Sequence, residues 1–174
     1  MIIVASAGNE GTNGMGYPGA YEPVISAAAS RWIGEWQHPS WWWFLDVVDP
    51  TNPEHFYIVP WSSREITGQD LDVAAPGTWV VGPYQTQMGK TSYYYLSGTS
   101  MASPHVAGTV ALMAQKNPGL TAGEAEIILE DSAIYLAPGC RDVYTPWGWE
   151  EACWGADATG AELLDAVAAL AAMP

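Results

Sequence analysis

Near the middle of the chain stands the stretch GTSMASPHVAG, residues 98–108. It places a serine, Ser100, ahead of a segment in which almost every position from Val106 to Ala114 is apolar or small. This pattern predicts a helix from Met101 to about Gln115 that is buried on all sides rather than on one face. Because proline is tolerated only in the first turn of a helix, Pro104 indicates that the helix begins close to Ser100.

The position of Ser100 has chemical consequences. A serine at the N-terminus of a buried helix lies beside unpaired backbone N–H groups and the positive end of the helix dipole. Both stabilise the negative charge that develops when a serine attacks a carbonyl group. Gly98 permits a close approach of the backbone there. A simpler interpretation is that Ser100 is an N-cap serine, which is common, and the three letters GTS alone do not separate the two.

Other segments indicate the surrounding elements. Three short apolar runs that end in turn residues predict strands at residues 2–7, 24–29 and 71–77. Two capping boxes, residues 121–124 and residues 159–162, each predict the start of a helix. Strands followed by long helices around an apolar sheet indicate a layered α/β fold, and the length of 174 residues suits one domain or a large piece of one.

The stretch at residues 98–108 closely resembles the serine motif of the subtilisin-like serine proteases. AGNEG at residues 7–11 resembles the segment that carries the oxyanion-hole asparagine of that family, and LDVAAPG at residues 71–77 resembles the strand and turn before the nucleophile. The resemblance runs from residue 2 to about residue 132 and resumes weakly in the last helix. It implies a three-layer subtilisin-like α/β fold with a mainly parallel sheet, of which residues 1–174 would be the C-terminal portion.

The resemblance also implies a role for individual residues. Ser100 would be the nucleophile that forms an acyl-enzyme with a polypeptide substrate, and Asn9 would donate its side-chain amide to the oxyanion. Glu10 would lie at the rim of the pocket for the side chain before the scissile bond, where it would favour basic or polar side chains. One wall of that pocket would consist of Ser6, Ala7 and Gly8.

The acid and the base of the catalytic triad are not evident in this sequence. His105 is five residues beyond Ser100, about one and a half helical turns, and therefore points away from it. We expect it to be a packed, hydrogen-bonded histidine. His38 and His55 lack the H-G-T context of the family's base, and no Asp stands in a D-T-G or D-S-G context. In the family both residues lie upstream of the asparagine segment, so we expect this chain alone to be nearly inactive and to need the N-terminal half.

Three interpretations follow. The chain is a fragment of a secreted serine endopeptidase, one subunit of a split enzyme, or a non-catalytic binding module. The third would use the segment from about residue 31 to 61, which holds six of the ten tryptophans and is interpreted as an insertion, a hairpin among its candidate forms. Its exposed aromatic side chains could bind a partner or polymer, or they could form a small satellite core. The presence of both Asn9 and Ser100 argues against the binding module.

Composition narrows the range of partners. Five Lys and Arg stand against 19 Asp and Glu, a formal net charge of −14, which makes nucleic acid an unfavourable partner. No apolar run is long enough for a membrane span, so no membrane partner is expected. No signal peptide is visible in residues 1–7, although the resemblance implies a secreted protein.

The two cysteines, Cys140 and Cys153, lie in a Gly-, Pro- and Trp-rich segment typical of an irregular exposed loop. They indicate a disulfide formed in an oxidising compartment, the alternative being two free thiols in a cytosolic chain. Neither a C-x-x-C spacing nor a nearby histidine supports a metal site at the cysteines. No complete cluster of cation ligands can be assigned from the sequence, although the resemblance makes calcium a candidate cofactor.

Overall fold

The structure, a computed structural model, describes residues 1–37 and 47–174. The strands are β1 (Val4–Ser6), β2 (Ile25–Trp32), β3 (Phe56–Ile58), β4 (Val73–Pro76), β5 (Val80–Gln87), β6 (Lys90–Leu96), β7 (Gly139–Thr145) and β8 (Gly148–Trp154). The α-helices are α1 (Thr99–Lys116), α2 (Ala122–Asp131) and α3 (Ala166–Ala172), and the 3-10 helices are η1 (Gly11–Asn13), η3 (Pro53–His55) and η4 (Ala156–Ala158). None of the helices in these ranges is long and apolar enough to cross a bilayer.

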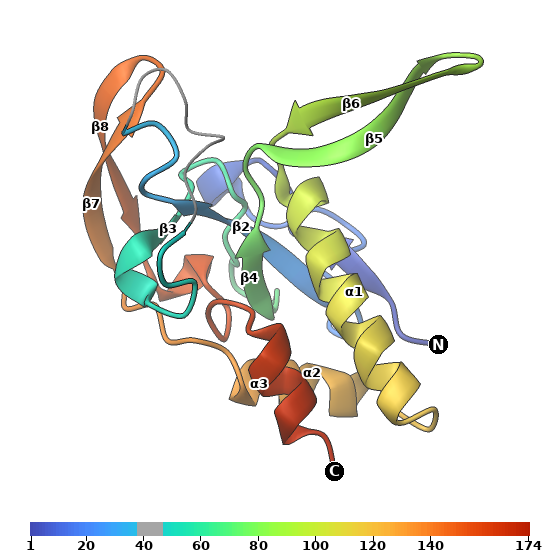
Figure 1. The fold of residues 1–174 in the computed structure, drawn as a ribbon. Coiled ribbons are helices and arrows are strands. Elements are labelled where there is room, and N and C mark those ends of the chain that lie inside the picture. The colour runs from blue at the N-terminus through green and yellow to red at the C-terminus, as the bar shows by residue number, and fades with distance from the viewer. Residues whose placement is uncertain (38–46) are drawn as a thin grey trace.

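The central sheet is built around β2 (Figure 1). β1 and β4 both pair with β2 in parallel, and β3 pairs with its last residues in antiparallel orientation. Ala27, Ala28 and Ala29 of β2 are fully buried. Because alanine side chains are short, they allow layers on both faces of the sheet to pack close to its backbone. Two of the three strand pairings are parallel, so the sheet is mainly parallel, as the resemblance implied.

One face of the sheet is covered by helices. Val106 and Met113 of α1, Leu129 of α2 and Ala169 of α3 share one buried cluster with Val73 of β4. The other face packs against β7 and β8 through a second cluster of buried side chains. Helices, sheet and hairpin form the three layers that Figure 1 presents.

Helix α1 begins at Thr99, next to Ser100 as predicted, but the expectation that it is buried on all sides is wrong for the described chain. Leu112 is 48% exposed, and Ala107, Gly108 and Ala111 are exposed beside it. The residue types are apolar all round the helix, but no described segment covers this face. Only the side toward the sheet is therefore buried.

The two capping boxes have different outcomes. Thr121 accepts a hydrogen bond from the Glu124 N–H, and Glu124 accepts from the Thr121 N–H, so α2 begins at a true capping box. The box at residues 159–162 is wrong: α3 begins later, with Asp165 as its N-cap. Glu162 has a positive φ of 99°, which ends any local helix there.

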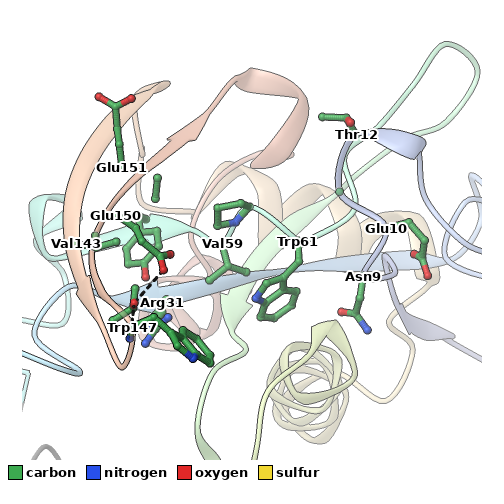
Figure 2. A pocket seen from close by; sticks show the side chains of 15 residues that line it. Asn9, Glu10, Thr12, Arg31, Val59, Trp61, Val143, Trp147, Glu150 and Glu151 are labelled. Atoms are coloured by element: carbon green, nitrogen blue, oxygen red, sulfur yellow. Dashed lines mark hydrogen bonds between the residues drawn. The ribbon is translucent and has the colours of Figure 1, made fainter.

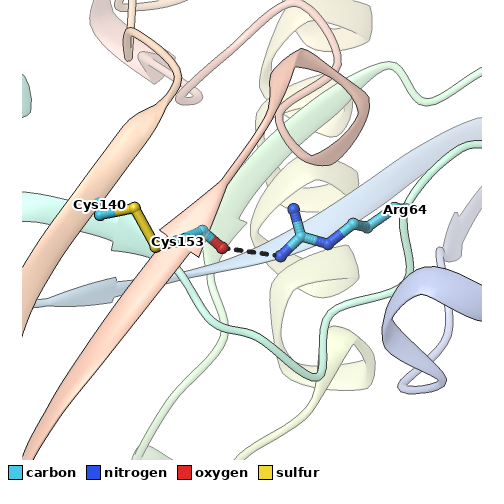
Figure 3. The surroundings of a disulfide bond; sticks show 3 residues. All are labelled: Arg64, Cys140 and Cys153. Carbon is cyan, nitrogen blue, oxygen red and sulfur yellow. Dashed lines mark hydrogen bonds between the residues drawn. A yellow bond between two sulfur atoms is a disulfide. The ribbon is translucent and has the colours of Figure 1, made fainter.

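The cysteine segment is a β-hairpin rather than an irregular loop. β7 and β8 pair in antiparallel register, and the disulfide joins the directly opposite residues Cys140 and Cys153 (Figure 3). The Arg64 Nη2 donates to the Cys153 carbonyl over 3.0 Å, and the Arg141 guanidinium contacts Glu54. The hairpin is thus closed by a covalent bond and attached to the body of the protein at two points.

The tryptophan-rich segment begins and ends as a hairpin, because the end of β2 pairs with β3. His38, Trp41, Trp42 and Trp43 lie outside the described residues. For these tryptophans, the two alternatives of a partner-binding surface and a satellite core stay predictions. Within the described part, Trp61 is partly buried against the core beneath β7 and β8. The Trp36 ring meets the edge of the Trp79 ring at 5.1 Å between centroids. These contacts attach the described part of the segment to the rest of the protein.

Candidate active site

The loop before Ser100 is held in place by backbone hydrogen bonds. The Gly77 N–H donates to the Ser30 carbonyl over 3.0 Å, and the Gly98 N–H donates to the Gly77 carbonyl over 2.8 Å. A Cβ on Gly77 would lie 2.5 Å from the Ala29 Cβ, so only glycine allows the chain to run this close to β2. The sheet thereby fixes the point at which α1 begins, and Ser100 lies exposed in its first turn.

Asn9 is attached to the start of the same helix. Its Oδ1 accepts from the Thr99 N–H over 3.0 Å and lies 3.1 Å from the Thr99 hydroxyl oxygen. Thr99 is fully buried, and its hydroxyl also accepts from the Gly8 N–H. Because an N–H group can donate only to the amide oxygen, this bond sets the orientation of the Asn9 amide. The Nδ2 of Asn9 is therefore the end that remains for a ligand.

The Asn9 Nδ2 and the Ser100 backbone nitrogen both lie close to Gly98. A Cβ built on Gly98 would lie 3.7 Å from the Asn9 Nδ2 and 3.7 Å from the Ser100 backbone nitrogen. Gly98 has a φ of 156° and carries no side chain that could occupy this space. Two N–H groups that lie close together beside a serine at a helix N-terminus are suited to stabilise an oxyanion.

The residues before Asn9 lie beside this place. Ala7 is fully buried and extends β1, because its N–H donates to the Ala27 carbonyl over 3.0 Å. Ser6 ends β1, and its carbonyl lies so close to Gly19 that a Cβ there would approach within 2.5 Å. Gly8 follows with a φ of 114°. The chain thus brings Ser6, Ala7 and Gly8 to the same end of the sheet as Asn9.

Glu10 does not extend freely into solvent. Its Oε2 accepts from the Ser63 hydroxyl over 3.0 Å, and its N–H donates to the same hydroxyl over 3.1 Å. A Cβ on Gly8 would lie 2.4 Å from the Glu10 Oε2, so the carboxylate lies directly against Gly8. The Glu10 carboxylate is therefore held beside Gly8 and Ser63, and its place at the rim of the substrate pocket stays a prediction.

Neither described histidine hydrogen-bonds to Ser100. The His105 Nδ1 lies 2.8 Å from the Met101 carbonyl, so the expectation that it is hydrogen-bonded is confirmed. Its side chain is exposed rather than packed, because it lies on the uncovered side of α1. The His55 Nδ1 lies 3.0 Å from the Asp49 carbonyl, at η3.

Sequence reasoning missed a cavity of about 570 Å³ that begins at Asn9 and extends past Trp61 to the β7–β8 hairpin (Figure 2). Tyr57 lines it and is 2% exposed, and burial raises the pKa of its phenol to about 12. Arg31 also lines it and pairs with Glu35. Burial raises the pKa of Glu35, and the positive charge of Arg31 partly offsets this rise. The alternation of Val143 and Thr145 with outward residues was the signal that could have identified the hairpin wall.

Sequence reasoning also missed a group of carboxylates. One ligand oxygen from each of Asp70, Asp72 and Glu126 lies within 4.8 Å of the others. Asp72 is 1% exposed, and its Oδ1 has no hydrogen-bond partner among the described residues. Burial raises the pKa of Asp72, with its hydrogen bonds to Ser26 opposing. Three carboxylates with an unpaired buried oxygen fit a hard cation such as calcium, which prefers oxygen ligands.

Comparison with known proteins identifies the fold and the family. The model of the subtilase family of peptidases matches residues 1–164. The chain belongs to the subtilase family. This confirms the resemblance found in the sequence, and the α/β fold class with it.

Individual relatives agree with this assignment. Subtilisin DY from Bacillus licheniformis is 34% identical over 140 residues, which cover 78% of this chain and 40% of that protein. Thermitase from Thermoactinomyces vulgaris is 33% identical over 132 residues, 76% of this chain and 36% of that protein. The chain therefore spans well under half the length of these subtilases.

Solved subtilase structures give the same result. A protease from Pseudoalteromonas arctica aligns over the whole chain with a TM-score of 0.68 and 26% identity, and the match covers 43% of that protein. Fervidolysin from Fervidobacterium pennivorans, a keratinolytic enzyme related to subtilisin, aligns over the whole chain with a TM-score of 0.66 and 27% identity, covering 23% of that protein.

Proposed function

We propose that the protein is a serine endopeptidase that cleaves polypeptides through an acyl-enzyme on Ser100. The observation that carries this proposal is the position of the Asn9 Nδ2 and the Ser100 backbone nitrogen, which both lie close to Gly98 beside the serine. Membership of a family whose relatives are proteases supports it.

The steps follow from this arrangement. The Ser100 Oγ bonds to the carbonyl carbon of the scissile peptide as its proton passes to a base. Asn9 and the Ser100 N–H donate to the oxyanion, and loss of one such donor typically costs about 3–4 kcal/mol of transition-state stabilisation. The amine then leaves with the proton, and water hydrolyses the acyl-enzyme. Ser6, Ala7 and Gly8 form a wall for the side chain before the scissile bond, with Glu10 at its rim.

We further infer that the base and its orienting acid come from residues that are not among the 174 of this sequence, either upstream in the same polypeptide or in a partner chain. His105 and His55 hydrogen-bond to backbone carbonyls and not to Ser100, which supports this. Without a base, a serine protease loses several orders of magnitude in rate. The chain alone is then nearly inactive, and the complete protein acts on polypeptides outside the cell.

Calcium is the cofactor that this proposal includes. Asp70, Asp72 and Glu126 would hold it, because one oxygen of each lies within 4.8 Å of the others and the buried Asp72 Oδ1 has no hydrogen-bond partner among the described residues. When bound, the cation supplies charge neutralisation at this position, and it takes no part in peptide cleavage.

A fluorophosphonate probe tests the proposal, because it bonds to an activated serine. We expect labelling of Ser100 and cleavage of casein when the chain is produced together with an upstream subtilase segment that supplies Asp and His. The chain alone should label far more slowly, and Ser100→Ala should not label. Labelling at another residue, or no labelling with the segment present, would contradict the proposal. Binding of peptides or polymers without labelling would favour the alternative, a binding module that uses the tryptophan-rich loop.

A further inference from the structure

The cavity beside Asn9 has a shape suited to a long side chain. Its volume of about 570 Å³ lies within the range of ligand pockets. Figure 2 places Asn9 at one end and the β7–β8 hairpin at the other, with Trp61 between them. The apolar side chains of Val59 and Val143 line it, which suits the hydrocarbon stem of a side chain rather than its polar end.

The charges that line the cavity favour a cation. Glu10, Glu150 and Glu151 are the acidic residues of the lining, and Arg31 is the one cation among its described residues. The Glu10 carboxylate is bonded to Ser63 and the Glu151 carboxylate points away from the other lining side chains, so Glu150 is the acidic group that faces the cavity (Figure 2). Arg31 pairs with Glu35. The Thr145 hydroxyl donates to the Glu150 carboxylate over 3.0 Å and holds it within the cavity (Figure 2).

An exposed indole lines the same cavity as Glu150. Trp147, at the turn of the β7–β8 hairpin, is 86% exposed and lines the cavity across from Trp61. A ligand that covers this indole would remove its apolar surface from water, which is favourable. The face of an indole attracts the ammonium or guanidinium group of a basic side chain. Aromatic and acidic groups together thus suit lysine or arginine.

The hairpin that forms the far wall is held before any ligand binds. The Cys140–Cys153 disulfide closes the hairpin, and Arg64 donates to the Cys153 carbonyl. A wall that is already in place reduces the conformational entropy lost on binding.

The position of the cavity determines which part of a substrate can enter it. The Asn9 amide marks where the carbonyl oxygen of the scissile bond would lie, and the segment from Ser6 to Gly8 precedes it on the side of the residue before that bond. The cavity lining contains Asn9 and the residues that follow it but none of Ser6 to Gly8. A second cavity of about 340 Å³ shares Trp61 and Trp147 and reaches Ser97, next to the nucleophile loop. An extended peptide therefore crosses Ser100 and continues into these cavities on the leaving side.

We propose that this cavity is a specificity site for a lysine or arginine side chain on the leaving side of the scissile bond, with Glu150 as its charge partner and Trp147 as its cover. The inference rests on the proposed peptidase function and names the substrate class of the same cleft. Glu150 lies on the turn-proximal part of β8, in a hairpin that none of the motifs of the catalytic site includes.

Peptides that differ in one side chain test this inference in the complete protein. A neutral, internally quenched decapeptide carries Lys, Gln or Glu in turn at each of the three positions before and after the cleaved bond. We expect kcat/KM to be roughly fivefold higher for Lys than for Gln at one position after the bond, the size of an exposed charge pair, and lower for Glu. The Lys preference should decrease at high salt, because salt screens exposed charges.

Two variants locate the effect. Glu150→Gln keeps an acceptor for Thr145 and removes the charge, so the ratio of kcat/KM for the Lys peptide to that for the Gln peptide should fall to about one. Asp142→Asn removes one charge from an exposed residue of β7 that does not line the cavity, and it should retain the preference.

Binding separates this inference from the proposed function. The dissociation constants of the same peptides are measured by calorimetry with Ser100→Ala, which needs no catalysis, and Lys should again bind roughly fivefold more tightly than Gln. Without fluorophosphonate labelling the peptidase proposal fails, whereas the binding preference still tests the cavity. Equal affinity for Lys and Gln, a preference for Glu, a preference only before the cleaved bond, or one unchanged by Glu150→Gln would overturn the inference.

Discussion

At the residue scale, the side-chain amide of Asn9 has two roles, one for its oxygen and one for its nitrogen. Its Oδ1 accepts from the Thr99 N–H and lies beside the Thr99 hydroxyl, which ties the segment to α1. Its Nδ2 is left for a ligand and lies, like the Ser100 backbone nitrogen, close to Gly98. Asn9→Asp keeps the acceptor and replaces the donor by a negatively charged oxygen. We therefore expect kcat to fall by about 10²–10³ or more with little change in KM or thermal stability.

Steady-state kinetics and thermal melts of the complete protein check this prediction. Asn9→Ala serves as the comparison, because it removes both atoms and should lower stability as well as kcat. An Asn9→Asp variant with unchanged kcat would remove Asn9 from the oxyanion site.

His105 lies on the same helix and gives the opposite expectation. Its Nδ1 is bound to the Met101 carbonyl, and its ring lies on the exposed side of α1. His105→Gln retains a donor for that carbonyl, so we expect kcat/KM to stay within about tenfold, whereas loss of a true base costs several orders of magnitude. The pH profile of kcat/KM should also persist, and its loss in this variant would identify His105 as the base.

At the element scale, the start of α1 was predictable because its causes are local. Gly98 permits the backbone conformation before the helix, and Pro104 restricts the position of its first turn, both within a few residues of Ser100. The start of α3 was not predictable in this way. Leu163 forms isolated bridges with Ala74 and Ile134, so contacts with distant segments hold the backbone extended where a capping box indicated a helix.

The candidate site divides along the same line. The motifs around Asn9 and Ser100 could be found in the sequence, but the hydrogen bond between Asn9 and Thr99 joins residues 90 positions apart. The cavity wall from the β7–β8 hairpin depends on how two distant segments pack. The hydrogen bond leaves no periodic pattern in the chain, and the alternation within β7 indicates a strand but not which segment it faces across the cavity.

The β7–β8 hairpin should depend on its disulfide. The two cysteines enclose a loop of about 14 residues, for which loss of the cross-link costs roughly 3 kcal/mol. The variant with both Cys140→Ser and Cys153→Ser should therefore have a melting temperature several degrees lower. Thermal melts of the complete protein check this, and dithiothreitol should lower the melting temperature of the native protein by a similar amount but leave the variant unchanged. Equal melting temperatures with and without reductant would show that packing alone holds the hairpin.

At the scale of the whole molecule, one consequence of the acidic composition is the carboxylate group between the 70–72 segment and α2. Asp70, Asp72 and Glu126 repel one another unless a cation lies among them. Millimolar calcium should raise the melting temperature of the complete protein, because a ligand that binds only the folded state stabilises it. Glu126→Gln should reduce that increase, whereas Glu151→Gln, which removes an exposed carboxylate elsewhere, should not. An equal response of all three proteins would place the calcium at another site.

The net charge of −14 and the buried carboxyl groups act on stability in the same direction. Burial raises the pKa of Glu35 and of Glu162 above their ordinary value of 4.5. The folded state therefore holds these protons more tightly than the unfolded state, unfolding releases protons, and the free energy of unfolding falls as the pH rises from 4.5 through the raised pKa values. Ionisation of the other carboxyl groups over the lower part of that range adds repulsion across the molecule, which salt screens.

Melting temperatures in EDTA at low ionic strength check this prediction. The melting temperature should be higher at pH 5 than at pH 8, and 1 M sodium chloride should narrow the difference. Glu162→Gln, which still offers an oxygen to the Leu136 N–H, should make the melting temperature depend less on pH. A melting temperature that rises steadily from pH 5 to pH 8 would mean that carboxyl groups with lowered pKa values contribute more to the pH dependence than those whose pKa burial raises.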